Sequence, residues 1–348
     1  MKKVKRLLAL ALSLLMVYSM VGCGSIANDG GDENDADKVY TFSWAHSSSA
    51  NGDRLPDASV EIIKEIEEKS NGRLVFQHYP ASQMGAERET LEGVTLGTVD
   101  LAVVSTGAIA SFFPEIEATS IPYLITSREI GWAVYDGEFG QMLGQMSEKA
   151  GWKWLGWAEN GLRMFSNKVR EIRTPADMKG LKIRTMENEI HMALVNALGA
   201  SATPITASEI YTALQQGTVD GQENGIALTY GLGFYEQLKY ITLLPHVYDP
   251  YIVCMSNNAW NSLPEDLQQL LQEEITKFCQ LEREYNQRDD EAYLQKMLDS
   301  GMTAYTPTEA EAQQFIDATA GIVDTIRDHV GDELVDAYIS AVEQAKKD

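Results

Sequence analysis

Arg184 is the residue whose type and position best suit binding chemistry. Leu181–Arg184 alternates apolar and charged side chains as a strand does, which places Arg184 at the C-terminal end of that strand. Open α/β sheets bind ligands at this edge, and a guanidinium holds both oxygens of a carboxylate in two parallel hydrogen bonds. The sequence predicts a carboxylate clamp here and leaves open a salt bridge to one of the many surface acids.

Two further polar residues stand at the ends of predicted strands. Arg163 follows a strand that carries three tryptophans, which are more often core residues than a ligand platform. Asn224 comes just after another strand, and its amide both donates and accepts, which suits a hydroxylated acid. A turn or cap role for Asn224 is the alternative.

The sequence carries none of the common enzyme signatures. It has no Gly-x-Ser-x-Gly elbow, no phosphate loop, no Gly-x-Gly-x-x-Gly after a strand and no His-Glu-x-x-His. The histidines are scattered without the spacing of metal ligands, at His46, His78, His191, His246 and His329. We therefore expect no catalytic residue, no metal and no cofactor.

The elements that must position these residues alternate between strand and helix. Strands are predicted at 39–44, 74–79, 99–104, 152–157 and 181–184, with helices at 56–69, 87–96 and 129–150. This order predicts an open, largely parallel α/β sheet. An internal echo, in which Gly-Thr-Val-Asp at 97–100 recurs at 217–220 after a similar helix, predicts two related lobes.

A long helical pattern at 264–300 is closed by Gly301 and predicts a helix of about 50 Å. That is longer than one lobe should need, so we expect it to span both lobes. The remaining thiols of the folded part, Cys254 and Cys279, fit no zinc spacing and are interpreted as buried and unpaired.

The N-terminus has the layout of an export signal. Four basic residues precede an uncharged run at 7–21 that ends in Gly22-Cys23, a bacterial lipoprotein pattern. We expect a signal peptide at 1–22 and lipidation of Cys23, with an ordinary secreted protein as the alternative. Residues 24–38 are rich in Gly, Asn, Asp and Glu and predict a flexible tether, so that 23–38 would join the lipid to the folded body.

A formal net charge of −23 excludes nucleic acid as a partner. The same field repels an anionic ligand at long range, so an acid-binding site needs its own local cation. Individual arginines are therefore informative.

Several stretches together resemble the solute-binding subunit of TRAP transporters, the dicarboxylate-binding type. The resemblance covers essentially everything after the tether and rests on the following matches: Leu181–Asn188, Leu198–Ala200, Pro204, Glu209–Asn224, Pro80–Arg88, Asn160–Arg163, His246 and Trp260–Asp266.

The resemblance implies a two-lobed periplasmic-binding-protein fold with a long helix spanning both lobes. Lobe I would comprise 39–160 and 249–288, and lobe II 161–248 and 289–348. By resemblance Arg184 is the principal clamp, Arg163 a second basic contact and Asn224 a polar contact. The other residues expected around the ligand are Ala45, His46, Glu87, Arg88, Ser105, Glu187 and Ala207, the last replacing an aromatic residue of many relatives.

We expect a monomer on the outer face of the cytoplasmic membrane that hands one organic acid to TRAP permease subunits. A sugar acid such as glucuronate or galacturonate is favoured, because residues 185–188 and the open Ala207 position resemble uronate-binding members. A C4-dicarboxylate is the alternative within the family. A secreted carbohydrate-active enzyme and a sensor lobe of a signalling receptor are the alternatives outside it.

Overall fold

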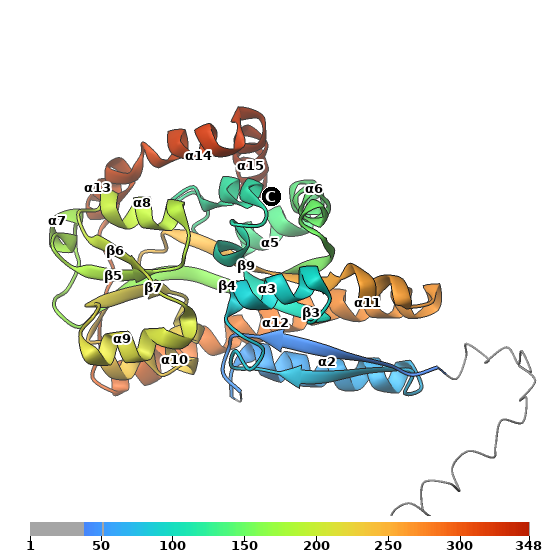
Figure 1. The fold of residues 1–348 in the computed structure, drawn as a ribbon. Helices are drawn as coiled ribbons and strands as arrows, with labels where there is room; N and C mark the ends of the chain where they lie inside the picture. The colour runs from blue at the N-terminus through green and yellow to red at the C-terminus, as the bar shows by residue number, and fades with distance from the viewer. Residues whose placement is uncertain (1–37, 51, 348) are drawn as a thin grey trace, which may run out of the picture. The chain divides into compact units, whose positions relative to one another are not determined.

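The protein is described here by a computed structural model of residues 38–50 and 52–347. Ten strands form one sheet with the order β2-β1-β3-β9-β4-β7-β5-β6, and β8 and β10 extend it beside β4 (Figure 1). The strands are β1 (Tyr40–His46), β2 (Leu74–Tyr79), β3 (Leu101–Ser105), β4 (Trp152–Asn167), β5 (Lys182–Thr185), β6 (Ser201–Pro204), β7 (Gly221–Asn224), β8 (Tyr240–Thr242), β9 (Val247–Ser256) and β10 (Thr303–Tyr305).

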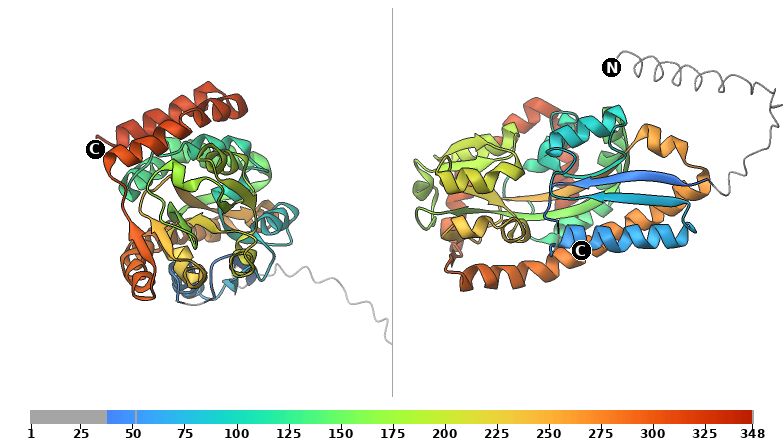
Figure 2. Two further views of the ribbon diagram at one scale, coloured as in Figure 1. Left: turned by 90° about the vertical axis from the view of Figure 1, so that its left-hand side faces the viewer. Right: turned by 60° about the horizontal axis from the view of Figure 1, so that its bottom comes forward.

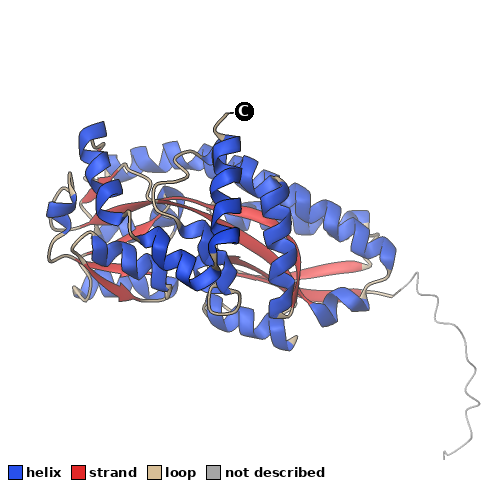
Figure 3. Ribbon diagram, turned by 90° about the horizontal axis from the view of Figure 1, so that it is seen from above, coloured by secondary structure: helices blue, strands red, loops and turns tan. Residues whose placement is uncertain are grey.

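Helices cover both faces of the sheet, as the view from above shows (Figure 3). They are α2 (Arg54–Lys69), α3 (Glu87–Leu96), α4 (Thr106–Ile109), α5 (Arg128–Asp136), α6 (Glu138–Ser147), α7 (Pro175–Met178), α8 (Glu189–Ala197), α9 (Ile210–Gln216), α10 (Ile226–Gly231), α11 (Asn257–Ser262), α12 (Glu265–Asp299), α13 (Glu309–Thr319), α14 (Ile322–Val330) and α15 (Asp332–Ala345), with short 3-10 turns η2 (Pro114–Ser120) and η4 (Ala207–Glu209) among the connections.

Apart from the short β8–β10 pair, the sheet is parallel only at its two ends, which corrects the expectation of a largely parallel sheet. β1 pairs in parallel with β2 and β3 at one end, and β5 pairs in parallel with β6 and β7 at the other. The centre is antiparallel, because β9 and β4 run against each other and against their neighbours. The two-lobed fold is confirmed, with β4 and β9 passing between the two ends.

Two predicted elements differ in extent from the sequence-based expectation. The strand predicted at 152–157 continues to Asn167, with a bulge at Glu159/Gly161 where Gly161 takes a φ of +112°. The helix predicted at 129–150 is broken into α5 and α6, because Gly137 adopts an extended conformation between them.

The internal echo is confirmed in detail. Gly97 ends α3 and Gly217 ends α9, both in the left-handed region with φ of 78° and 76°. In each copy the aspartate that follows binds a backbone N–H of the neighbouring parallel strand: Asp100 Oδ2 accepts from Ser43 N at 2.8 Å and Asp220 Oδ2 from Lys182 N at 2.9 Å. The same local unit therefore builds both ends of the sheet.

The long helix α12 contacts both ends of the molecule, as predicted (Figure 2). It packs against α2 of the first end and α10 of the second. Two of its buried residues are Phe278 and Cys279, and both Cys254 and Cys279 are unpaired, as expected. The predicted lobe boundaries stay a prediction, since α14 and α15 pack against η2, α5 and α6 as well as α8.

A buried polar network ties α12 to the N-terminus of α2 and to β4. Arg54 lies 3.0 Å from Asp53 Oδ1 and 3.0 Å from Glu282 Oε1, with all three side chains fully buried. Glu282 Oε2 also accepts from Glu159 N at 2.8 Å. Burial raises the pKa of Glu282 to about 8, although Arg54 opposes the shift.

This raised pKa predicts a pH-dependent stability. The folded state keeps a proton on Glu282 that the unfolded state releases near pH 4.3, so wild-type stability falls as pH rises towards about 8. Glu282→Gln mimics the protonated form. Between pH 6 and pH 9 its free energy of unfolding should therefore fall by about 2 kcal/mol less than that of wild type. Urea denaturation at both pH values measures this difference. The exposed Glu284→Gln on the same helix is the control; parallel pH curves for wild type and Glu282→Gln would contradict the assignment.

Candidate ligand-binding site

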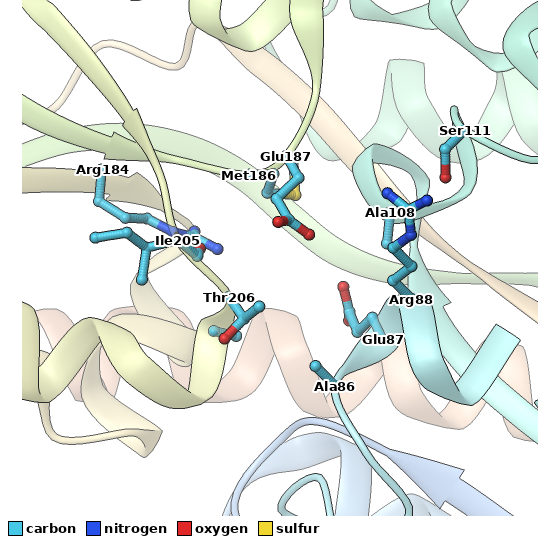
Figure 4. A pocket seen from close by; sticks show the side chains of 11 residues that line it. Ala86, Glu87, Arg88, Ala108, Ser111, Arg184, Met186, Glu187, Ile205 and Thr206 are labelled. Carbon is cyan, nitrogen blue, oxygen red and sulfur yellow. Dashed lines mark hydrogen bonds between the residues drawn. The ribbon is translucent and has the colours of Figure 1, made fainter. Parts of the chain in front are cut away.

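A pocket lies between the loops that follow β5 and β6 and the start of α3 (Figure 4). A water-sized sphere can reach about 40 Å³ inside it, so only a small cavity is present in this structure. Its walls are formed by Ala86, Glu87, Arg88, Ala108, Ser111, Arg184, Met186, Glu187, Ile205, Thr206 and Ala207. Charged residues therefore meet there from both ends of the sheet.

Arg184 enters the pocket from β5 as a buried cation. Its residue is 3% exposed, and its Nε donates to the carbonyl of Ile205 at 2.7 Å. Within residues 38–50 and 52–347 no carboxylate forms an ion pair with it, and its two terminal nitrogens have no protein acceptor. Burial lowers the pKa of Arg184 to about 10, so it stays charged at neutral pH. Arg184 can accordingly accept an anion from outside the chain.

Arg163 does not line the pocket, because its guanidinium is occupied. Its Nε and Nη2 donate to Glu223 Oε2 and Oε1 at 2.5 and 2.9 Å, and its Nη1 donates to Asp249 Oδ2 at 2.9 Å. Burial alone would raise the pKa of Glu223, but Arg163 holds this pKa well below its usual value. His246 Nε2 lies 3.1 Å from the same carboxylate, with its ring stacked on Phe165.

The opposite wall of the pocket is built around Glu87. Its carboxylate accepts hydrogen bonds from Ser47 Oγ at 2.9 Å and from Ser105 Oγ at 2.6 Å. Burial raises the pKa of Glu87, and these hydrogen bonds oppose the shift. Arg88 is more exposed, with 54% of its side chain accessible, and Glu187 is exposed as well. Carboxylate oxygens thus face the pocket across from Arg184 (Figure 4).

The structure brings five of the ten predicted ligand-binding residues to the pocket: Glu87, Arg88, Arg184, Glu187 and Ala207. The other five do not line it, and Ala45 among them is a buried residue of β1. Asn224 Nδ2 donates to Gln222 Oε1 at 2.5 Å, and Ser105 supports Glu87. His46 Nε2 lies 2.8 Å from His78 Nε2, and burial lowers the pKa of His46 to about 3. Cys23 lies outside the described residues.

Sequence reasoning did not single out Met186, Thr206 and Ile205 in the pocket, or Asp249 behind it. The sequence did contain a signal for Asp249, because this residue is an acid within the otherwise apolar run at 247–255. The acid serves Arg163 and also Thr106, whose N donates to Asp249 Oδ1 at 3.3 Å. Met186 and Ile205 are apolar residues like many others, and their positions depend on how the loops after β5 and β6 pack.

Two other features are absent from residues 38–50 and 52–347. No group of three or more His, Cys, Asp or Glu side chains there is placed to hold a metal ion. None of the helices between residues 38 and 347 is both long and apolar enough to cross a membrane.

Comparisons with known proteins agree with this geometry. Residues 45–328 match the family model of bacterial extracellular solute-binding protein, family 7. A solute-binding protein of Verminephrobacter eiseniae is 39% identical over 242 residues, which cover 70% of this chain and 72% of the relative.

Solved structures are similar over most of the chain. The sugar acid binding protein of Advenella mimigardefordensis in complex with galactonate superposes with a TM-score of 0.86 at 25% identity, covering 88% of this chain and 99% of that one. A TRAP periplasmic solute binding protein of a Polaromonas species bound to D-erythronate gives a TM-score of 0.82 at 33% identity, covering 86% and 98%.

The contrast between the two arginines predicts that their removal changes the stability of the ligand-free protein by very different amounts. Arg163→Ala leaves Glu223 and Asp249 buried without their cation, so it should cost about 3 to 5 kcal/mol of unfolding free energy. Arg184→Ala removes a buried cation that has no acid partner, so it should change stability by less than about 1 kcal/mol. Urea denaturation without added ligand compares the two. A larger loss for Arg184→Ala than for Arg163→Ala would contradict the assigned contacts.

Proposed function

The chain belongs to the bacterial extracellular solute-binding proteins of family 7, and on that premise we propose that it captures a small organic acid for a TRAP membrane permease. One observation carries the proposal: Arg184 is buried, charged and without a protein carboxylate, at the wall of a pocket between two lobes. A buried cation without a counter-charge is costly. A ligand carboxylate would supply the missing charge through a two-pronged hydrogen bond.

The ligand that fits best is a sugar acid. Only one deeply buried cation lines the pocket, and Glu87, Glu187 and Thr206 across from it or beside it offer acceptors for hydroxyl groups. The relatives bound to galactonate and D-erythronate support this class, since both ligands carry one carboxylate and several hydroxyls. Ala207 lines the pocket with a small side chain where many relatives have an aromatic residue, and for this reason a uronate is the ligand that we favour.

A C4-dicarboxylate is the second candidate, and Arg88 is the observation that favours it. This residue lines the pocket opposite Arg184 and could neutralise a second carboxylate. Glu87 beside it on α3 and Glu187 on the loop after β5 oppose that arrangement, because like charges at short range repel. The sugar acid is therefore preferred.

The proposal assigns the protein a transport role without catalysis. The alternative of a secreted carbohydrate-active enzyme is tested by incubating the protein with uronates and glycosides and looking for turnover. Product formation by pure protein would replace the transport proposal with an enzymatic one.

Removing the guanidinium of Arg184 should abolish high-affinity binding. Truncating one partner of a buried charge pair typically costs about 2 to 5 kcal/mol, so Arg184→Ala should weaken binding of D-galactonate or D-galacturonate about a hundredfold or more. Arg184→Lys keeps the charge but loses the fork, and an intermediate affinity is expected. Isothermal titration calorimetry measures both. Wild-type affinity in Arg184→Ala would exclude this clamp.

We also propose a lipid anchor at Cys23, with residues 23–38 as the tether of a monomer on the outer face of the cytoplasmic membrane. Cys23→Ser removes the acceptor thiol, so the protein should move from the membrane fraction to the soluble fraction of expressing cells. Immunoblotting after fractionation reads this out, with Cys254→Ser as the control at a buried thiol. Equal partitioning of wild type and Cys23→Ser between the two fractions would contradict the lipid anchor and favour an ordinary secreted protein.

A further inference from the structure

Met186 reaches across the pocket from one end of the sheet to the other. It follows β5, is 6% exposed and lines the pocket, yet it contacts Gly107, which lies in α4 after β3. In the sheet three strands separate β3 from β5, so the two strands run about 19 Å apart. The contact therefore bridges the two lobes above the sheet and does not come from strand pairing.

Gly107 leaves a notch that the thioether of Met186 fills. A Cβ placed on Gly107 would lie 2.4 Å from Met186 Cε, 2.5 Å from Sδ and 3.3 Å from Cβ, and these are its three nearest heavy atoms. Gly107 has no positive φ and sits within a helix, so its backbone does not require glycine. The three nearest atoms that a side chain would meet at this position all belong to Met186.

The same contact connects to the polar wall of the pocket. Ser105 Oγ lies 3.5 Å from Met186 Sδ and donates to Glu87 Oε2 at 2.6 Å. In this position Met186 also covers Ser105, the serine that donates a hydrogen bond to Glu87. It narrows the cleft at that point. Met186 is flexible and polarisable, which suits a residue that must leave and re-enter a notch.

We propose that Met186 is the closing residue of this binding protein: its thioether enters the Gly107 notch as the lobes approach, and the contact adds to ligand affinity. The inference rests on the proposed function, because it requires closure around a ligand. The free energy of closure contributes to the apparent affinity, since only the closed form holds the acid on both sides. Met186 thus determines affinity without pairing with the carboxylate.

A double-mutant cycle tests the contact. Gly107→Ala should weaken binding of D-galactonate and D-erythronate about tenfold, because its methyl group overpacks the notch. Met186→Ala should weaken binding by a similar factor through loss of the buried thioether. In the Met186→Ala background, Gly107→Ala should have no further effect within about twofold, since Cε and Sδ are gone and only the Cβ at 3.3 Å remains.

The controls separate a local contact from a general effect. Gly321→Ala adds a methyl group where nothing lies within 4 Å, and it should bind like wild type. Equal losses from Gly107→Ala in the presence and absence of Met186 would overturn the proposal, as would wild-type affinity in both single variants.

A cross-link examines the same contact without a ligand. In the double variant Gly107→Cys with Met186→Cys the Cβ atoms would lie about 3.3 Å apart, close to disulfide geometry. Mild oxidation should remove two titratable thiols, and D-galactonate should accelerate the reaction. Gly321→Cys with Met186→Cys should keep its thiols. Free thiols in the first pair after oxidation, with native circular dichroism, would overturn the contact; wild type that binds neither acid while the cross-link forms would overturn only the ligand class.

Discussion

The arrangement of this molecule depends on an imbalance between two neighbouring buried arginines. Arg163 has carboxylates on Nε, Nη1 and Nη2, supplied by Glu223 and Asp249, whereas Arg184 has only a backbone carbonyl on Nε. Arg163 disfavours the charge of Arg184, and Glu223 favours the charge of both arginines. The fold thus pairs its buried carboxylates with Arg163 and leaves Arg184 to be neutralised by an anion from outside the chain.

The central strands of the sheet and their neighbour β7 hold this imbalance in place. Glu223 lies on β7, Arg163 on β4 and Asp249 on β9, and these strands are consecutive neighbours in the order of the sheet, with β9 and β4 hydrogen-bonded along most of their lengths. Asp249 extends the connection to Thr106 at the start of α4. Rigid, paired strands therefore fix the occupied arginine, while Arg184 stands at the free end of a short strand where a ligand can approach.

Local patterns predicted much of this architecture, and long-range packing decided the rest. The alternation at 181–184, the helix at 264–300 and the Gly-Thr-Val-Asp echo each depend on neighbouring residues, and each is confirmed. The antiparallel centre was not predictable in this way, because β4 and β9 are distant in sequence and read as ordinary apolar strands. For the same reason Arg163 was expected in the pocket. Its guanidinium instead binds Asp249, which lies 86 residues later in the chain.

The two thiols of the folded body have a consequence for where it can mature. Cys254 and Cys279 are buried and unpaired, and burial raises the pKa of Cys279 to about 12, so neither is available as a thiolate. Folding of the described body therefore forms no disulfide bond. It should proceed equally well in anoxic, sulfide-rich or aerated surroundings.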